Sequence, residues 1–141
     1  MKLDIMEALR YLGAGSSPPE VLRRDMEQIA DQLTAAVRPR YAYRVFSTVH
    51  EERGVLLREA GILLTGRSAA RMLAQCDQAV LLICTLGAGF ETMLRAEQAR
   101  DMARAVMLDA CGSAWVESGC NAAEEELAAR LPGRYLTDRL S

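Results

Sequence analysis

The stretch AGFETMLRAEQARDMARAVMLDACGSAWVESGCNAAEEELAARL, from Ala88 to Leu131, decides the fold, because its helical signal is almost unbroken. We expect two helices in it. The second carries an apolar stripe at helical spacing, formed by Val106, Ala110, Ser113, Val116, Cys120, Ala123, Leu127 and Leu131. Gly112 and Gly119 weaken an isolated helix by roughly 1 kcal/mol each, but they also let another backbone approach closely. The pattern therefore predicts a long, tightly packed central helix that ends at Pro132-Gly133.

The residues before this stretch alternate between helical and extended patterns. Helices are expected over residues 4–12, 19–37 and 68–75, with Ser17 and Ser68 near the N-caps of the last two. Strands are expected over residues 41–49 and 79–85, the second as a central strand, and residues 55–57 and 62–64 form a further strand or a hairpin. The sequence predicts an α+β fold, with a small, mostly antiparallel sheet and helices around it. No linker divides the chain, so residues 1–141 are expected to form a single domain.

Composition and charge exclude several classes of partner. A chain of 141 residues suits one hydrophobic core. Its 17 basic and 19 acidic residues give a net charge of -2, so nothing attracts a nucleic acid. The longest apolar run, from Ala79 to Leu86, is too short to span a bilayer, and the N-terminus does not read as a signal peptide. We therefore expect no partnership with nucleic acid or membrane.

The four cysteines do not form a metal-binding pattern. They are Cys76, Cys84, Cys111 and Cys120, with no C-x-x-C among them, and His50 is the one histidine. We expect reduced thiols that behave as small buried apolar groups, and a cytoplasmic location. His50, flanked by charged residues, fits an exposed turn better than a general base.

One face of the long helix gathers acidic and amide side chains. Glu117, Asn121 and Glu124 are spaced at i, i+4 and i+7, with Glu125 at the edge of the same face. Carboxylates there are suited to accept hydrogen bonds from ribose hydroxyls or to pair with a sulfonium cation. From spacing alone, a solvated face is the commoner explanation, and the run of three acids ending at Glu126 favours it.

Two further segments contain residues suited to ligand binding. Thr85 to Glu91 joins an apolar strand to a helix start, and its glycines permit a close approach to an anion. It lacks the third glycine of a dinucleotide-binding loop, so an ordinary turn is the better explanation. In the tail, Arg134 and Arg139 with Tyr135 are suited to bind an amino-acid carboxylate, although such a tail is usually flexible surface.

Four segments resemble the activation domain of cobalamin-dependent methionine synthase and its stand-alone relatives. Glu7 to Gly13 is similar to the opening of the stand-alone members, and Thr85 to Glu91 to their strand-to-helix turn. Leu108 to Glu125 resembles their long helix. Arg139-Leu140-Ser141 resembles the start of their R-x-S-x-G-Y segment, which we expect to continue past Ser141. The resemblance spans nearly the whole chain, and it implies the same α+β fold.

The resemblance also implies a function. Members of this family bind S-adenosylmethionine in a shallow groove and present it to cobalamin on a separate domain or protein. An electron from a flavodoxin-like donor and the methyl group then restore methylcobalamin, which serves methionine synthesis. By this resemblance, Arg139 holds the ligand's carboxylate or nearby backbone, and Glu125 or Glu124 makes the acidic contact. The chain lacks the D-x-H-x-x-G segment that ligates cobalamin, so a corrinoid methyltransferase is the expected partner.

Two other functions remain open from the sequence. The chain could be an interaction or scaffold module that keeps the fold without the ligand. It could also be an independent Rossmann-type methyltransferase, a hypothesis that rests on Gly87 and Gly89 and that requires a parallel sheet.

Overall fold

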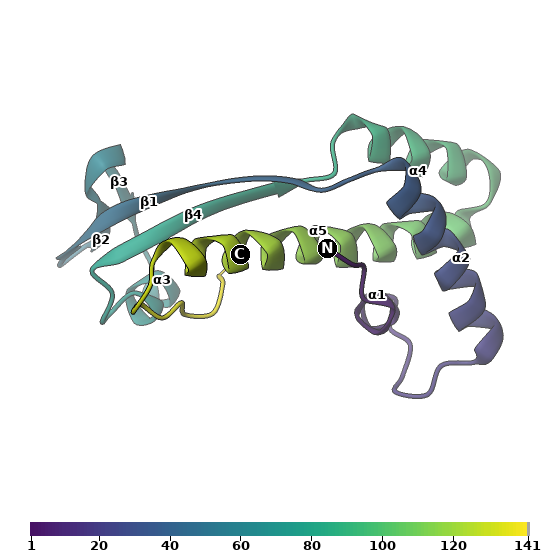
Figure 1. The fold of residues 1–141 in the computed structure, drawn as a ribbon, viewed down its shortest axis with the longest axis horizontal. Coiled ribbons are helices and arrows are strands. Elements are labelled where there is room, and N and C mark those ends of the chain that lie inside the picture. Colours follow the sequence, from purple (N-terminus) through teal and green to yellow (C-terminus); the bar gives the residue numbers. More distant parts are fainter. Residues whose placement is uncertain (141) are drawn as a thin grey trace. The chain divides into compact units, whose positions relative to one another are not determined.

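The computed structural model describes residues 1–140 and confirms the α+β class (Figure 1). Within these residues, five helices accompany one four-stranded antiparallel sheet. The helices are α1 (Ile5–Tyr11), α2 (Glu20–Ala36), α3 (Arg67–Met72), α4 (Ala88–Arg100) and α5 (Met102–Arg130), with a short 3-10 helix at Arg58–Ala60. The strands are β1 (Arg40–Glu51), β2 (Gly54–Leu57), β3 (Ile62–Leu64) and β4 (Gln78–Thr85).

The sheet has the strand order β3-β2-β1-β4. β2 pairs antiparallel with β1 and with β3, so the two short apolar runs form a hairpin. β4 lies at an edge, which corrects the expectation of a central strand. A continuous apolar run does not show which side chains a strand buries. In β4, Ala79 is buried, whereas Leu81 and Ile83 are 40% and 71% exposed.

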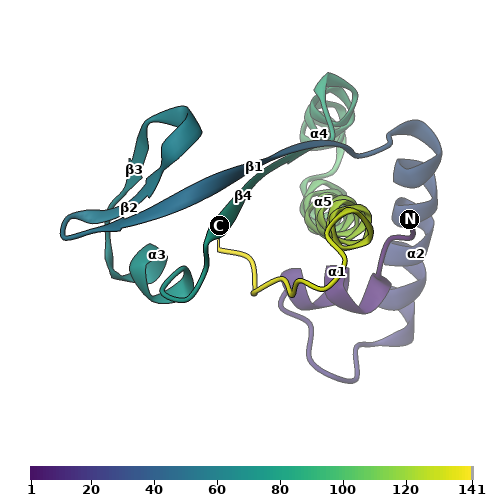
Figure 2. The same cartoon turned by 60° about the vertical axis from the view of Figure 1, so that its left-hand side comes forward.

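The chain divides into two compact units, one of which is mainly helical. This unit consists of Met1–Tyr41 and Cys84–Ala123. Its core joins buried residues of α1, α2, α4 and α5, and Figure 2 shows α5 nearly end-on with the other three helices around it. Trp115 on α5 donates its indole N–H to the carbonyl of Val37, 2.8 Å away. Ser118 donates its hydroxyl to the carbonyl of Lys2 at 2.8 Å. These bonds attach α5 to both the start of the chain and the end of α2.

The glycines of α5 confirm the predicted close packing. A Cβ atom built on Gly112 would lie 2.5 Å from the ring of Phe90. One built on Gly119 would lie 2.6 Å from the Sγ atom of Cys84 and 2.8 Å from the Cβ atom of Pro39. Neither position has room for a side chain, so α4, β4 and the Pro39 segment approach the helix backbone directly.

The apolar stripe expected on α5 is only partly correct. Val106 is 51% exposed, while its neighbours Ala105, Leu108 and Cys111 are buried. The predicted stripe is displaced by one residue at its start. Helices pack on several sides of α5, so its buried surface is wider than a single stripe. Farther along, Ala123 and Leu127 are buried as expected.

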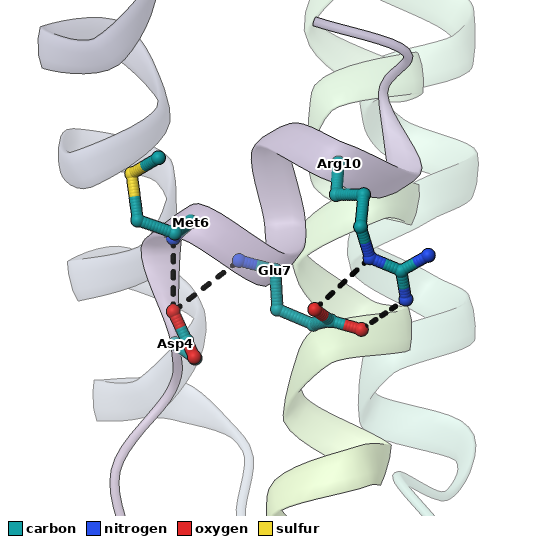
Figure 3. A network of polar contacts seen from close by, with 4 residues as sticks. All are labelled: Asp4, Met6, Glu7 and Arg10. Atoms are coloured by element: carbon teal, nitrogen blue, oxygen red, sulfur yellow. Dashed lines mark hydrogen bonds and ion pairs between the residues drawn. The ribbon is translucent and has the colours of Figure 1, made fainter. Parts of the chain in front are cut away.

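Helix α1 begins with a side-chain cap (Figure 3). The Asp4 carboxylate accepts hydrogen bonds from the amides of Met6 at 2.9 Å and Glu7 at 3.2 Å, which satisfies N–H groups that the first turn leaves unpaired. Glu7 and Arg10 form an ion pair on the next turn. Ser17 does not cap α2, because Pro19 holds the N-cap position without a side-chain bond. Ser68 lies near the start of α3 as expected, although Gly66 is the N-cap residue and provides no side-chain bond.

The second unit contains Ala42–Ile83 and the chain from Glu124 onward. Its core consists of Phe46, Val55, Leu57, Leu73 and Ala79. Thr48 ties β1 to the loop before β4, because its amide and hydroxyl donate to the carbonyls of Asp77 and Cys76 at 3.0 and 2.7 Å. In β1 the expected alternation is present, with Tyr41, Tyr43 and Val45 half-buried, but Phe46 on the opposite face is the buried anchor.

Replacement of Gly119 by Ala tests the close packing around α5. Overpacking costs about 1–3 kcal/mol, here about 2–3 kcal/mol because the added Cβ would lie within 3 Å of two atoms, and the helix propensity of alanine returns about 1 kcal/mol. We expect a net loss of about 1–2 kcal/mol in the free energy of unfolding, measured by urea denaturation. The control is Gly15→Ala, since a Cβ at Gly15 meets nothing within 4 Å. A Gly119→Ala protein as stable as the unsubstituted chain would contradict the packing described.

Candidate functional site

The tail after α5 places one predicted arginine against one predicted acid. Arg139 Nη1 lies 2.7 Å from Glu124 Oε1, and the two side chains are 31% and 35% exposed. The ion pair is therefore partly shielded from water. Its two residues are fifteen positions apart in the sequence, and folding brings them together. Both residues belong to the second unit. This pair is the part of the predicted site that the fold brings together.

The other predicted site residues are placed differently. Glu125 follows Glu124 on α5 and is exposed, about 100° farther around the helix. The tail arginine therefore meets the first of the two candidate acids. Glu117 is half-buried and Asn121 is exposed, and both belong to the helical unit. The charge of Glu117 contributes to raising the pKa of Arg10, after the larger effect of Glu7. Ser141, the last residue of the proposed motif, lies outside the described residues.

A second ion pair anchors the same tail. Arg134 reaches Asp77, which precedes β4, with Nη1 to Oδ1 at 2.7 Å and Nη2 to Oδ2 at 3.4 Å. The two parallel contacts form the fork geometry that guanidinium groups make with carboxylates. The hydrogen bond from Arg134 lowers the pKa of Asp77. No sequence signal indicated this partner, because Asp77 and Arg134 are 57 residues apart. Tyr135, the third tail candidate, is exposed.

The turn from Thr85 to Glu91 lines a cavity of about 340 Å³ in the helical unit. One wall comes from this turn, with the buried Phe90 ring, and the other from α5, where Asp109, Gly112, Ser113 and Val116 face it. Gly87 has a φ of 76°, which favours glycine. Its amide donates to the Thr85 hydroxyl at 3.0 Å. The sequence singled out this turn but missed Asp109, since nothing in its spacing points toward the cavity.

The cavity carries two acidic side chains, and a guanidinium lies close to its turn, since a Cβ built on Gly87 would lie 3.6 Å from Arg40 Nη2. Glu91 and Asp109 both line it, and in the part of the chain that the structure describes neither forms an ion pair. The turn does not belong to a Rossmann fold either. A Rossmann-type methyltransferase needs a parallel sheet, and this sheet is antiparallel. That hypothesis is wrong.

The thiols of Cys84, which lines the cavity, and of Cys111, which lies in the core, are protonated at neutral pH. Burial raises the pKa of Cys84 to about 11, with a smaller contribution from the nearby Cys120 thiol. Burial alone raises the pKa of Cys111 to about 11. His50 Nε2 lies 3.0 Å from the carbonyl of Cys76 on an exposed surface. Its ring is therefore bonded to the backbone rather than to a nucleophile.

Comparison with protein-family profiles and with curated protein sequences finds no match to this chain. Within residues 1–140, His, Cys, Asp and Glu side chains do not gather in groups of three or more that could hold a metal ion. None of the helices in the described chain has the length and apolar character needed to cross a lipid bilayer.

Titration of Asp77 tests the anchoring pair. Arg134→Gln is expected to raise the pKa of Asp77 toward its ordinary value of 3.8, measured from the carboxyl carbon by NMR. Because the folded pKa lies below the unfolded one, the pair stabilises the protein above pH 3.8 and stops doing so as pH falls through the lowered value. The control is Arg130→Gln, which removes the guanidinium of the last residue of α5. An Asp77 pKa that does not change would mean that the fork is absent in solution.

Thiol labelling tests the burial of Cys84 and Cys111. With pKa values of about 11, little reactive thiolate exists near neutral pH. We expect both residues to be alkylated slowly by iodoacetamide at pH 7.5, with a rate that rises about tenfold per pH unit up to pH 10. Mass spectrometry of tryptic peptides measures each cysteine separately, and fast labelling at pH 7.5 would contradict the burial.

Proposed function

We propose that this chain binds S-adenosylmethionine and presents it to the cobalamin of a partner corrinoid protein, such as a methionine synthase, so that the cobalt is remethylated. The observation that carries the proposal is the 2.7 Å pair between Arg139 and Glu124. It joins the two kinds of side chain that the sequence assigned to ligand binding, a tail guanidinium and an acid on the last turns of the long helix.

The chemistry of the pair suits the amino-acid end of this ligand. S-adenosylmethionine carries a carboxylate, an ammonium and a sulfonium group. Its carboxylate can take the guanidinium of Arg139 in a bidentate contact, and its ammonium can take the carboxylate of Glu124. An exchange of partners of this kind leaves no charge unpaired. Glu125 is exposed beside Glu124, and its negative charge favours a ligand with a net positive charge.

The role of the chain in the reaction is to hold and orient the ligand. Positioning alone makes a large contribution to reaction rates. The corrinoid partner supplies the cobalt that receives the methyl group, and a flavodoxin-like donor supplies the electron. We place the protein in the cytoplasm, where its four thiols stay reduced.

A scaffold module without the ligand is the second candidate. The observation that favours it is that both tail arginines, Arg134 and Arg139, already have carboxylate partners within the chain. A surface whose charges are satisfied internally needs no ligand for stability. The two functions differ in whether S-adenosylmethionine competes for Arg139.

Calorimetric titration with S-adenosylmethionine tests the proposal. We expect measurable binding, and a loss of about 10- to 100-fold in affinity for Arg139→Gln and for Glu124→Gln, because each removes one charge-assisted contact. The control is Arg130→Gln, which removes an analogous surface pair with Glu126 at 3.0 Å and should leave affinity unchanged. S-adenosylhomocysteine, which lacks the sulfonium charge, should bind more weakly than S-adenosylmethionine.

Two results would overturn the proposal. One is the absence of binding at millimolar ligand, with and without a cobalamin-loaded methionine synthase, which favours the scaffold module. The other is an affinity that Arg139→Gln leaves unchanged, which would mean that the ligand does not use the tail. Circular dichroism of each variant checks that a loss of affinity does not reflect unfolding.

A further inference from the structure

Two cysteines of the helical unit lie side by side. The Sγ atom of Cys84, near the end of β4, donates a hydrogen bond to the carbonyl oxygen of Val116, 3.6 Å away. The same sulfur is 2.6 Å from the position that a Cβ atom on Gly119 would take. Val116 and Gly119 are three residues apart on α5 and share one face of it. The sulfur of Cys84 therefore rests directly on that face.

Cys120 projects onto the same face of α5. It lies four residues after Val116, and the side chain of such a residue leans back over the preceding helical turn. The two thiols form a hydrogen bond, and the Cys120 thiol contributes to raising the pKa of Cys84 to about 11, after the larger effect of burial. Both cysteines belong to the helical unit. The backbone contacts of Cys84 and the hydrogen bond between the thiols thus support the same arrangement.

The other two thiols are bonded elsewhere. Cys111 Sγ lies 3.9 Å from the carbonyl oxygen of Met26 in the buried core. Cys76 Sγ lies 3.7 Å from the carbonyl oxygen of Met72 in the second unit. Cys84 differs from both because it lines the cavity of about 340 Å³. A small reagent can therefore reach Cys84 from solvent, with Cys120 as its immediate neighbour.

We propose that Cys84 and Cys120 form a modification site, at which a low-molecular-weight disulfide such as oxidised glutathione converts the two thiols into a disulfide. The proposal is independent of S-adenosylmethionine binding. The new bond joins the end of β4 to α5, both of which line the cavity. It also closes a loop that contains the whole of α4, and closing a long loop stabilises the folded chain. The oxidised protein therefore has a more rigid cavity.

The exchange needs no further reactant. The Cys84 thiolate attacks one sulfur of oxidised glutathione, forms a mixed disulfide and releases the first glutathione thiolate. The Cys120 thiolate then attacks the sulfur of Cys84 and releases the second. Two electrons pass from the protein to the glutathione disulfide, and the two glutathione thiolates take up the two protons that the cysteines lose. Because the thiols are adjacent, the second step is intramolecular and faster than attack by another molecule.

The raised pKa of Cys84 determines how fast the exchange begins. Little thiolate exists near neutral pH, so the first step is slow there and accelerates about tenfold per pH unit. The site therefore responds to a sustained rise in oxidised glutathione rather than to a brief one. In a reducing compartment the pair remains as two thiols.

Mass spectrometry of the full chain tests the site. The reduced protein is treated with oxidised glutathione at about pH 8.5, alkylated, and digested without reduction. Cleavage at acidic residues separates the four cysteines from one another, because Asp77 and Glu117 lie between neighbouring ones. We expect the linked Cys84–Cys120 peptides to be at least ~10 times as abundant as any other linked pair. The midpoint of thermal unfolding should rise by at least ~5 °C, and dithiothreitol should reverse the rise.

The variant Cys120→Ser separates the two steps of the exchange. Here the reaction should stop at a mixed disulfide between Cys84 and glutathione, without a linked peptide and without a rise in the unfolding midpoint. The matched control is Cys76→Ser in the second unit, which should form the linked peptides as the unsubstituted chain does.

Three results for the unsubstituted chain would overturn the proposal. The chain could stay reduced, it could carry glutathione on Cys84 without forming the cross-link, or it could link other cysteines equally often. A linked chain with an unchanged unfolding midpoint would overturn the inferred stiffening of the cavity.

Discussion

Two positions of α5 carry no side chain, and the helical unit depends on this constraint. At Gly112 the ring of Phe90 occupies the space of a Cβ atom, and at Gly119 the sulfur of Cys84 and the ring of Pro39 do so. Glycine in a helix costs about 1 kcal/mol of helix stability. The missing side chains allow α4 and the end of β4 to contact the α5 backbone directly. That contact fixes the turn from Thr85 to Glu91 against α5 and so creates the cavity between them.

The polar contacts of the tail are arranged differently from the packing around α5. Its tail has no regular secondary structure, yet two of its arginines have defined carboxylate partners. Exposed ion pairs each contribute little to stability, so these two pairs matter mainly because they position the tail. The Arg139 pair is partly shielded from water, with side chains that are 31% and 35% exposed. The Arg134 fork joins the same tail to the loop before β4.

Strand β4 follows this loop and also contacts α5. β4 packs Cys84 against α5 at one end and follows Asp77 at the other. Along its length it presents Leu81 and Ile83 to solvent on one face. A strand that is apolar on both faces but covered on only one is poorly suited to an isolated edge. The apolar composition of this run indicated burial, but its edge position leaves Leu81 and Ile83 exposed.

The sequence by itself determined most of the secondary structure. Periodicity identified the helices and strands, and the glycines of α5 predicted its close packing, because both signals are local. It did not determine that β4 lies at an edge, that Val106 is exposed, or that Phe46 anchors the second core. These depend on which neighbours cover each face, and an apolar run is compatible with several arrangements. The tertiary structure alone decided that Arg139 meets Glu124 rather than Glu125, and that Arg134 meets Asp77. Such pairs join residues that are distant in the sequence. The positions of charged residues along the chain do not show which of them lie close together after folding.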